Sequence, residues 1–171
     1  MKYFTFFLQD CMKTSSGNIF QKIAHWVVNH IIKWYQYGNP LIHSGIVLNF
    51  EEKDFNRDNP YVVEAVEQGI VEEPSYTKGN LRYFQLLMNE EQSKLFPSII
   101  KKYLGDPYDT RGLLSFLLRH KESVKNEYFC SELVYQIGNR ELGLDIFNKG
   151  CGIEPYMVNP SMLLMSNAKE V

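Results

Sequence analysis

The chain has 171 residues, of which 44% are hydrophobic, and this is enough for a single domain (1–171) with a sizeable core. Its formal net charge is −2 and its lysines and acids are interspersed, so nucleic acid and anionic membrane surfaces are not expected as partners. The three cysteines include no Cys-x-x-Cys pair, which argues against a disulfide framework and a zinc knuckle. We expect no metal ion and no cofactor.

The N-terminal stretch from Tyr3 to Leu8 is apolar and aromatic, but only six residues long. Gln9 and Asp10 follow it without a small-residue cleavage site, so we interpret it as a first strand rather than a signal peptide. No segment approaches the ~18 apolar residues that a membrane span requires. We therefore expect a cytoplasmic protein with no integral membrane segment.

A helical pattern runs from Asn18 to Tyr37, where apolar residues recur at spacings of three and four. The Gly-Asn-Pro sequence that follows ends it. Its aromatic side chains, which include Trp26 and Trp34, belong to the core or line an apolar groove suited to a lipid-like acyl group. The sequence leaves both interpretations open.

A cluster of strands and then a series of helices are predicted after this segment. Glu51 to Asn59 is a charged connection between two of the strands, and Glu73-Pro74 is expected to end the third. This order is an α+β pattern rather than the regular alternation of a parallel sheet. The predicted strands are Leu41–Phe50, Tyr61–Val66, Gly69–Glu72 and Asn80–Leu87, and the predicted helices are Glu90–Tyr103, Leu113–His120, Cys130–Asn139 and a short closing helix, Pro160–Leu164.

Cys130 stands where an extended polar segment gives way to a helical pattern. Phe129, Leu133 and Ile137 share one helical face, so the cysteine belongs to the first turn of a buried helix. The free N–H groups and the dipole at that end favour a thiolate over a thiol, which is the arrangement used for a nucleophile. A small buried core residue is the alternative, because free cysteine is among the most buried residue types.

A thiol nucleophile needs a base, and His43 is the best placed of the four histidines. It opens the strand His-Ser-Gly-Ile-Val-Leu, in which Gly45 leaves space on the same face beside the imidazole. A histidine at a sheet edge is the alternative. His25 and His30 fall on different faces of the first predicted helix, and His120 lies in a solvated Arg-His-Lys run.

The next predicted strand contains one acid, Glu64, in the apolar run Tyr-Val-Val-Glu-Ala-Val. A carboxylate among buried valines is costly unless it is paired. If this strand pairs with the His43 strand, Glu64 can reach the imidazole and orient it. The alternatives are that Glu64 lies on a solvent face or accepts from a backbone N–H.

Four short motifs occur in order along the chain: His-Ser-Gly-Ile-Val-Leu, Tyr-Val-Val-Glu-Ala-Val, Gly-Asp-Pro-Tyr-Asp and Tyr-Phe-Cys-Ser-Glu-Leu-Val. Together they resemble the circularly permuted NlpC-type papain-like cysteine hydrolases, the YiiX-like branch in particular. The closing Pro-Ser-Met-Leu is similar to that family's Pro-Ser-x-Leu. The resemblance implies a small antiparallel sheet packed against helices, with the nucleophile at a helix N-terminus.

The resemblance also implies a role for each matching residue. Cys130 would be the nucleophile, His43 the base and Glu64 the residue that orients the base. Tyr108, from Gly-Asp-Pro-Tyr, would line the substrate cleft near the thiol, with a core tyrosine as the alternative. Glu132 matches the family's Cys-Ser-Glu, and we assign it no chemical role.

These roles imply a peptidase or amidase type of hydrolase that cleaves an amide or ester through a thioester, with release to water or to another acyl acceptor. The implied substrate is a peptide, a peptidoglycan-type amide or an acylated amine or lipid. Two other functions are considered. One is an inactive domain of the same fold that binds a peptide or a partner protein. The other is a metal-dependent hydrolase with His43, Glu64 and Cys130 as ligands.

Overall fold

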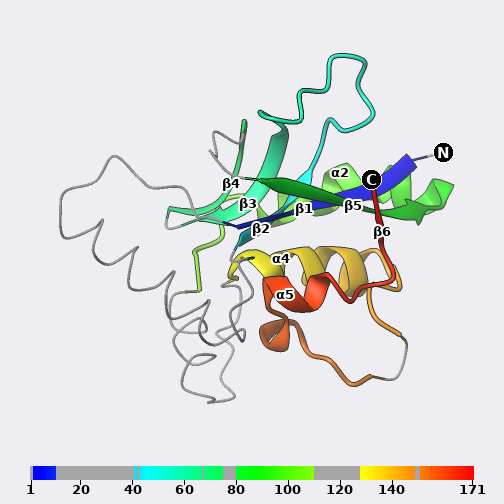
Figure 1. The fold of residues 1–171 in the computed structure, drawn as a ribbon. Helices are drawn as coiled ribbons and strands as arrows, with labels where there is room; N and C mark the ends of the chain where they lie inside the picture. Colours follow the sequence, from blue (N-terminus) through cyan, green and yellow to red (C-terminus); the bar gives the residue numbers. More distant parts are fainter. Residues whose placement is uncertain are drawn as a thin grey trace.

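The computed structural model describes residues 2–10, 41, 43–66, 68–74, 80–109, 128–148 and 151–171. These residues form an α+β structure built on a six-stranded antiparallel sheet (Figure 1). The strand order across the sheet is β4-β3-β2-β1-β5-β6. The strands are β1 (Lys2–Gln9), β2 (His43–Val47), β3 (Tyr61–Val66), β4 (Gly69–Pro74), β5 (Leu81–Met88) and β6 (Lys169–Glu170).

The five strands predicted from the sequence are confirmed, although some bounds differ. β2 is shorter than the predicted Leu41–Phe50, because the chain turns after Val47. β4 ends at Pro74, two residues beyond the predicted Glu72, so the strand includes the Glu73-Pro74 pair that was expected to follow it. β4 is the outermost strand on its side of the sheet, where a proline without an N–H is tolerated. β6 was not predicted, and the predicted helices Asn18–Tyr37 and Leu113–His120 lie outside the described residues.

β1 lies inside the sheet, where it pairs with β2 along one edge and with β5 along the other. Its alternating side chains separate two hydrophobic clusters. Phe4, Phe6 and Leu8 belong to the main core, which they share with the helices. Phe7 belongs to a smaller cluster on the other face, with Val47, Val62 and Tyr83 and the partly buried Phe50, Phe55 and Leu81.

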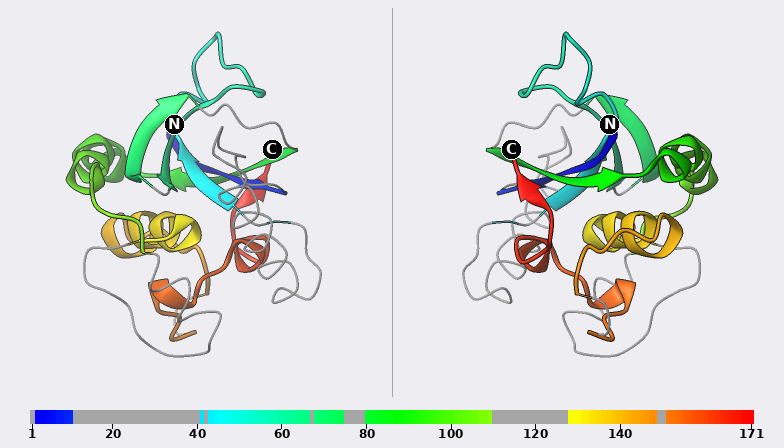
Figure 2. Two further views of the ribbon diagram at one scale, coloured as in Figure 1. Left: turned by 90° about the vertical axis from the view of Figure 1, so that its left-hand side faces the viewer. Right: turned by 90° about the vertical axis from the view of Figure 1, so that its right-hand side faces the viewer.

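The helices cover one face of the sheet, and the long connection of residues 48–60 stands on the other (Figure 2). Tyr83 of β5 holds that connection against the sheet, because its hydroxyl donates to the Arg57 carbonyl and its ring packs against Phe50 and Phe55. Among the residues that the structure describes, no helix has the length and apolar character of a membrane span.

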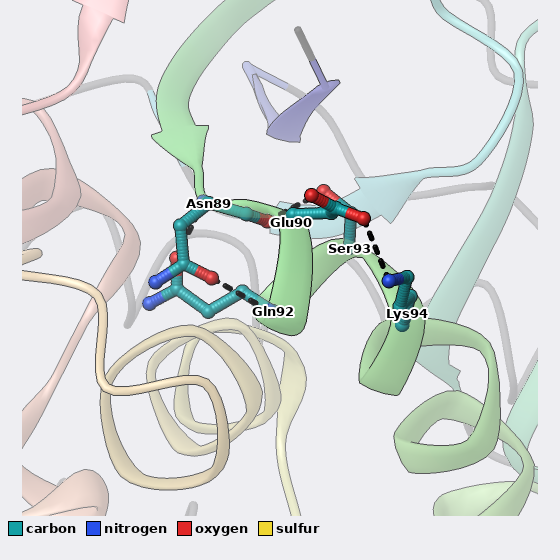
Figure 3. Close-up of polar contacts among 5 residues, drawn as sticks. All are labelled: Asn89, Glu90, Gln92, Ser93 and Lys94. Carbon is teal, nitrogen blue, oxygen red and sulfur yellow. Dashed lines mark hydrogen bonds and ion pairs between the residues drawn. The ribbon is translucent and has the colours of Figure 1, made fainter.

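Helix α2 (Glu90–Tyr103) has the predicted bounds, and its start is closed by a reciprocal capping box (Figure 3). The Asn89 side chain accepts from the Gln92 N–H at 2.8 Å, and the Gln92 side chain accepts from the Asn89 N–H at 2.8 Å. Ser93 and the Glu90–Lys94 ion pair add further contacts in the first turn. Two otherwise unpaired N–H groups are thereby satisfied, which explains the sharp start at Glu90.

Helix α4 (Cys130–Tyr135) is buried at every position and packs against β2 and β3. Its axis continues as a π-helical segment (Gln136–Glu141), so the helix predicted to Asn139 changes type after Tyr135. Gly138 permits close packing there: a Cβ at this position would lie 2.6 Å from the Ile146 side chain and 2.9 Å from the Phe4 ring. The chain closes through a 3₁₀ turn (Pro155–Met157) and helix α5 (Pro160–Leu163), which begins at the predicted proline.

Candidate active site

Cys130 is the first residue of α4, as the sequence pattern indicates, and is only 5% exposed. Phe129 before it is extended, so the chain changes conformation at the cysteine itself. Two contacts fix this first turn. The Ser131 hydroxyl donates to the Val158 carbonyl at 2.6 Å, and the Glu132 carboxyl accepts from the Phe129 N–H at 3.5 Å. The thiol is therefore held at the positive end of a short, anchored helix.

His43 opens β2, and Glu64 lies on the adjacent strand β3. The register pairs Ile46 with Val63, so continuing the antiparallel pairing places Gly45 opposite Glu64. His43 and Glu64 then project from the same face of the sheet. The His43 Nε2 and Glu64 Oε2 atoms lie 2.6 Å apart, and both side chains are buried. The expected pairing of the two strands and the expected contact of Glu64 with the imidazole are both present.

Gly45 makes this arrangement possible. A Cβ at this position would lie 2.6 Å from the Phe7 ring and 3.1 Å from the Glu64 Cβ. Any larger residue would push one of these side chains aside. The space that the sequence assigns to Gly45 is therefore filled by the Phe7 ring, which supports the histidine at a ring-centroid distance of 5.9 Å, and by Glu64.

Cys130 and His43 lie close enough for each side chain to shift the pKa of the other. Glu64 occupies Nε2 of the ring, so Nδ1 is the nitrogen left for the thiol. Nδ1 has no partner at full hydrogen-bond geometry within the described part of the chain. Nδ1 is therefore available to the thiol, and catalytic hydrogen bonds often tighten only when substrate binds.

The electrostatics of the site favour a charged pair. Burial lowers the pKa of His43, but the contacts with Cys130 and Glu64 outweigh it and raise this pKa to about 10. Burial raises the pKa of Cys130, but the contacts with His43 and Ser44 outweigh it and lower this pKa below its usual value. Both directions favour a Cys130 thiolate beside a His43 imidazolium at neutral pH.

Tyr108 lies close to the start of the cysteine helix. A parallel bridge joins Tyr108 to Tyr128, and the Asp109 N–H donates to the Tyr128 carbonyl at 3.1 Å. Because Tyr128 is two residues before Cys130, this bridge brings Tyr108 to the start of α4. Burial raises the pKa of Tyr108, and the charges of Cys130 and Asp109 raise it further. The phenol therefore keeps its proton and remains a hydrogen-bond donor.

Asp109 and Glu132 form a second pair of buried acids beside the site. Asp109 is fully buried and Glu132 is 3% exposed. Burial raises the pKa of Glu132 to about 8; the Phe129 N–H opposes this shift, and the charge of Asp109 adds to it. Glu132 is thus mostly protonated at neutral pH, next to the residue that caps the cysteine helix.

Sequence reasoning quoted Ser44, Asp109 and Glu132 within motifs but gave none of them a part in the site. Ser44 was detectable in principle, because alternation in a fully buried strand turns it to the face opposite His43. Asp109 is brought to the start of α4 by the Tyr108–Tyr128 bridge, which joins segments that no local pattern connects, and Glu132 is buried because α4 is buried at every position. His25, His30, His120 and Cys11 lie outside the described residues, and Cys151 is exposed.

The alternative of a metal site on His43, Glu64 and Cys130 does not fit the geometry. Metal ligands at about 2.0–2.3 Å from one ion are separated from each other by more than the 2.6 Å found between His43 and Glu64. Within the described ranges, no group of three or more His, Cys, Asp or Glu side chains is arranged to hold a metal ion.

A cleft of about 330 Å³ lies elsewhere, between α2, the start of β1 and the chain after β2. Phe96 and Val47 contribute apolar walls, and Lys2 and Glu51 stand among the charged groups. None of Cys130, His43, Glu64 and Tyr108 lines it. We place the candidate chemistry at the cysteine, because the buried, oppositely charged groups are there and not in this cleft.

Comparison of the chain with protein-family models, with curated proteins and with solved structures gave no match. The assignment of the site therefore rests on the geometry of Cys130, His43 and Glu64.

Proposed function

We propose that this protein is a cysteine hydrolase of the peptidase or amidase type, with Cys130 as nucleophile, His43 as base and Glu64 as the residue that orients the base. The observation that carries the proposal is the buried 2.6 Å contact between His43 Nε2 and Glu64 Oε2. It leaves one ring nitrogen for the thiol at the start of α4. A nucleophile, a base and an orienting group in contact are the minimum set for covalent acyl transfer.

The first half of the reaction forms a thioester. His43 holds the proton of Cys130, and the thiolate attacks the carbonyl carbon of an amide or ester. The negative charge that develops on the carbonyl oxygen is held by the Cys130 backbone N–H, one of the unpaired donors at the helix start. Tyr108, which keeps its phenolic proton, lies on the same side of the site. His43 then protonates the leaving amine or alcohol, and the carbon–nitrogen or carbon–oxygen bond breaks.

The second half releases the acyl group. Neutral His43 takes a proton from a water molecule, or from another acceptor, and the resulting oxygen nucleophile attacks the thioester carbon. The Cys130 sulfur leaves as a thiolate, and His43 again carries the proton. Throughout both halves Glu64 accepts from Nε2–H, so the ring keeps Nδ1 toward the sulfur and its positive charge is stabilised in the buried site.

The resemblance to circularly permuted NlpC-type papain-like enzymes supports the same proposal for the fold. In the permuted order the histidine strand precedes the cysteine helix, as β2 precedes α4 here. The substrate class that this implies is a peptide, a peptidoglycan-type amide or an acylated amine or lipid.

A thiol-reactive acyl probe tests the function directly. We expect labelling of Cys130 at neutral pH, no such labelling in Cys130→Ser, and labelling slowed about 10²-fold or more in His43→Ala. Peptide mass spectrometry identifies the labelled cysteine, and the exposed Cys151 serves as an internal control for unactivated thiols. Labelling of Cys11 or Cys151 with Cys130 untouched would favour an inactive binding domain instead.

A further inference from the structure

Ser44 lies between His43 and Gly45 on β2, opposite Leu8 of β1, and is completely buried. Strand alternation turns its side chain away from the face of His43 and toward the face that α4 covers. Cys130 is the first residue of α4, so the serine and the cysteine meet where the helix start rests on the strand.

The Ser44 hydroxyl is a buried polar group without a conventional partner. Within the described part of the chain, its Oγ atom has no hydrogen-bond partner at full geometry. A buried hydroxyl in this position is unfavourable, because it has lost water and gained nothing. The Ser44 hydroxyl and the Ser44 backbone N–H both lower the pKa of the Cys130 thiol, so they lie near it.

We propose that the Ser44 hydroxyl is held in place as a hydrogen-bond donor to the Cys130 thiolate, and that it is a further catalytic residue of this site. This inference rests on the proposed function, because only an ionised cysteine gives the hydroxyl a strong acceptor. A neutral thiol is a weak acceptor, which explains why the hydroxyl lacks a good partner when the cysteine is protonated. The hydroxyl keeps its own proton throughout the reaction.

Ser44 supplies what His43 alone does not. The imidazolium neutralises the thiolate but must move its proton to the leaving group, after which the sulfur of the thioester carries no charge. When the thiolate is regenerated, a donor that never gives up its proton stabilises it independently of the state of His43. The hydroxyl and the backbone N–H of one residue then hold the sulfur from the strand side, while the imidazole faces it from the strand end.

Ser131 is a matched comparison. It is also completely buried and is the neighbour of Cys130, but its hydroxyl already has an acceptor, the Val158 carbonyl at 2.6 Å. Removing the Ser131 hydroxyl removes that hydrogen bond and should destabilise the fold. Removing the Ser44 hydroxyl deletes a group that has no hydrogen-bond partner among the described residues while Cys130 is protonated. We therefore expect loss of the Ser131 hydroxyl to lower stability without changing the Cys130 pKa. Loss of the Ser44 hydroxyl should raise the Cys130 pKa without destabilising the fold in which this thiol is protonated.

The test is the pH dependence of iodoacetamide alkylation at Cys130, followed by peptide mass spectrometry, in the wild type, Ser44→Ala, Ser44→Thr and Ser131→Ala. The acid limb is the pH range over which the alkylation rate rises as the thiol ionises. In Ser44→Ala we expect the midpoint of this limb to move up by about one pH unit, which corresponds to the loss of one hydrogen bond to a charged group. At a pH below the wild-type acid limb, where the thiol is protonated, the melting temperature of Ser44→Ala should stay the same or rise, and at neutral pH it should fall because the thiolate has lost a donor. Ser44→Thr keeps a hydroxyl, so its acid limb should have the wild-type midpoint. Ser131→Ala should have a lower melting temperature than the wild type and an acid limb with the wild-type midpoint.

The outcomes separate the two proposals. If the wild-type acid limb lies below the ordinary thiol value and Ser44→Ala has the same midpoint, the role of Ser44 is overturned while the proposed function stands. A wild-type limb at the ordinary thiol value of ~8.5 would overturn the proposed function, and this inference with it. Failure of Ser44→Ala to fold would also contradict the inference, because a hydroxyl without a partner cannot be required for folding.

Discussion

His43 and Glu64 stand 21 residues apart in the chain, yet their side chains meet across neighbouring strands at 2.6 Å in a fully buried position. Burial of two ionisable groups is unfavourable unless each satisfies the other. The contact therefore does two things at once. It stabilises a carboxylate among the valines of β3, and it fixes the orientation of the imidazole that faces Cys130.

The first prediction separates the charge of Glu64 from its hydrogen bond. Glu64→Gln keeps an oxygen that accepts from Nε2–H, whereas Glu64→Ala removes the acceptor and the charge. We expect kcat/KM on an ester or amide substrate to fall more than about 10²-fold in Glu64→Ala and less in Glu64→Gln. The unfolding free energy of Glu64→Ala should fall by about 1–3 kcal/mol, because buried His43 loses its partner. Equal activity of all three proteins would exclude an orienting role.

The second prediction concerns pH. The pKa of Cys130 is lowered, and that of His43 is raised from 6.5 to about 10. Activity should therefore rise with pH below the ordinary thiol value, stay level through neutral pH, and fall as pH rises through about 10. For stability the sign is the same on the alkaline side: the contribution of protonated His43 is complete below 6.5 and is lost as pH rises from 6.5 through about 10.

The measurement is kcat/KM from pH 4 to 11, with urea unfolding at the same pH values. In His43→Gln, the part of the decrease in unfolding free energy at alkaline pH that is due to this residue should be absent. An activity profile that rises only near pH 8.5 would mean an unactivated thiol and would contradict the charged pair.

The sequence predicted the strands and the cysteine helix because their side-chain periods are local properties. β3 and α2 have the predicted bounds, and Cys130 lies at the predicted helix start. The end of β4 lies two residues beyond the predicted Glu72, because a strand at the sheet edge tolerates proline as its last residue. The two-residue strand β6 carries no pattern of its own and forms only by pairing with β5.

The candidate site divides in the same way. His43, Glu64 and Cys130 were suggested by residue type, motif and position in their elements. Ser44 was not, because its part depends on which helix covers the second face of β2, and that is a tertiary contact. Glu132 was quoted without a role, since Asp109 is brought to the start of α4, beside Glu132, by the Tyr108–Tyr128 bridge.

The third prediction uses Glu132. Its pKa is raised from 4.5 to about 8, so its contribution to stability is full below pH 4.5 and is lost as pH rises through about 8. Glutamine resembles the protonated acid and can still accept from the Phe129 N–H. We expect Glu132→Gln to match the wild type near pH 5 and to melt a few degrees higher near pH 9, at about 2–4 °C per kcal/mol.

Glu141 is the control for this behaviour. Its pKa is lowered by the hydrogen bond from Lys102 and then by that from Tyr103, so it stabilises the fold above pH 4.5. Glu141→Gln should melt lower than the wild type at pH 7 and lose that difference as pH falls below 4.5. A melting temperature of Glu132→Gln that is below the wild type at pH 9 would mean that the Glu132 carboxylate has a partner that stabilises its charge.

The fourth prediction tests whether packing sets the geometry of the histidine. In Gly45→Ala the new methyl group meets the Phe7 ring at 2.6 Å and the Glu64 Cβ at 3.1 Å, so the Phe7 ring must move, Glu64 must give by a few tenths of an ångström, and the packing around the imidazole changes. We expect a loss of about 1–3 kcal/mol of stability, as is usual for overpacking, together with a loss of activity in the molecules that remain folded.

Gly138→Ala is the matched control, since its methyl group meets the Ile146 side chain at 2.6 Å and the Phe4 ring at 2.9 Å, away from the histidine. Gly138→Ala should lose comparable stability and keep its activity per folded molecule. Urea unfolding gives the stability, and active-site titration with the acyl probe gives the folded, reactive fraction. If both variants lose stability and neither loses activity per folded molecule, the position of Glu64 does not control the histidine.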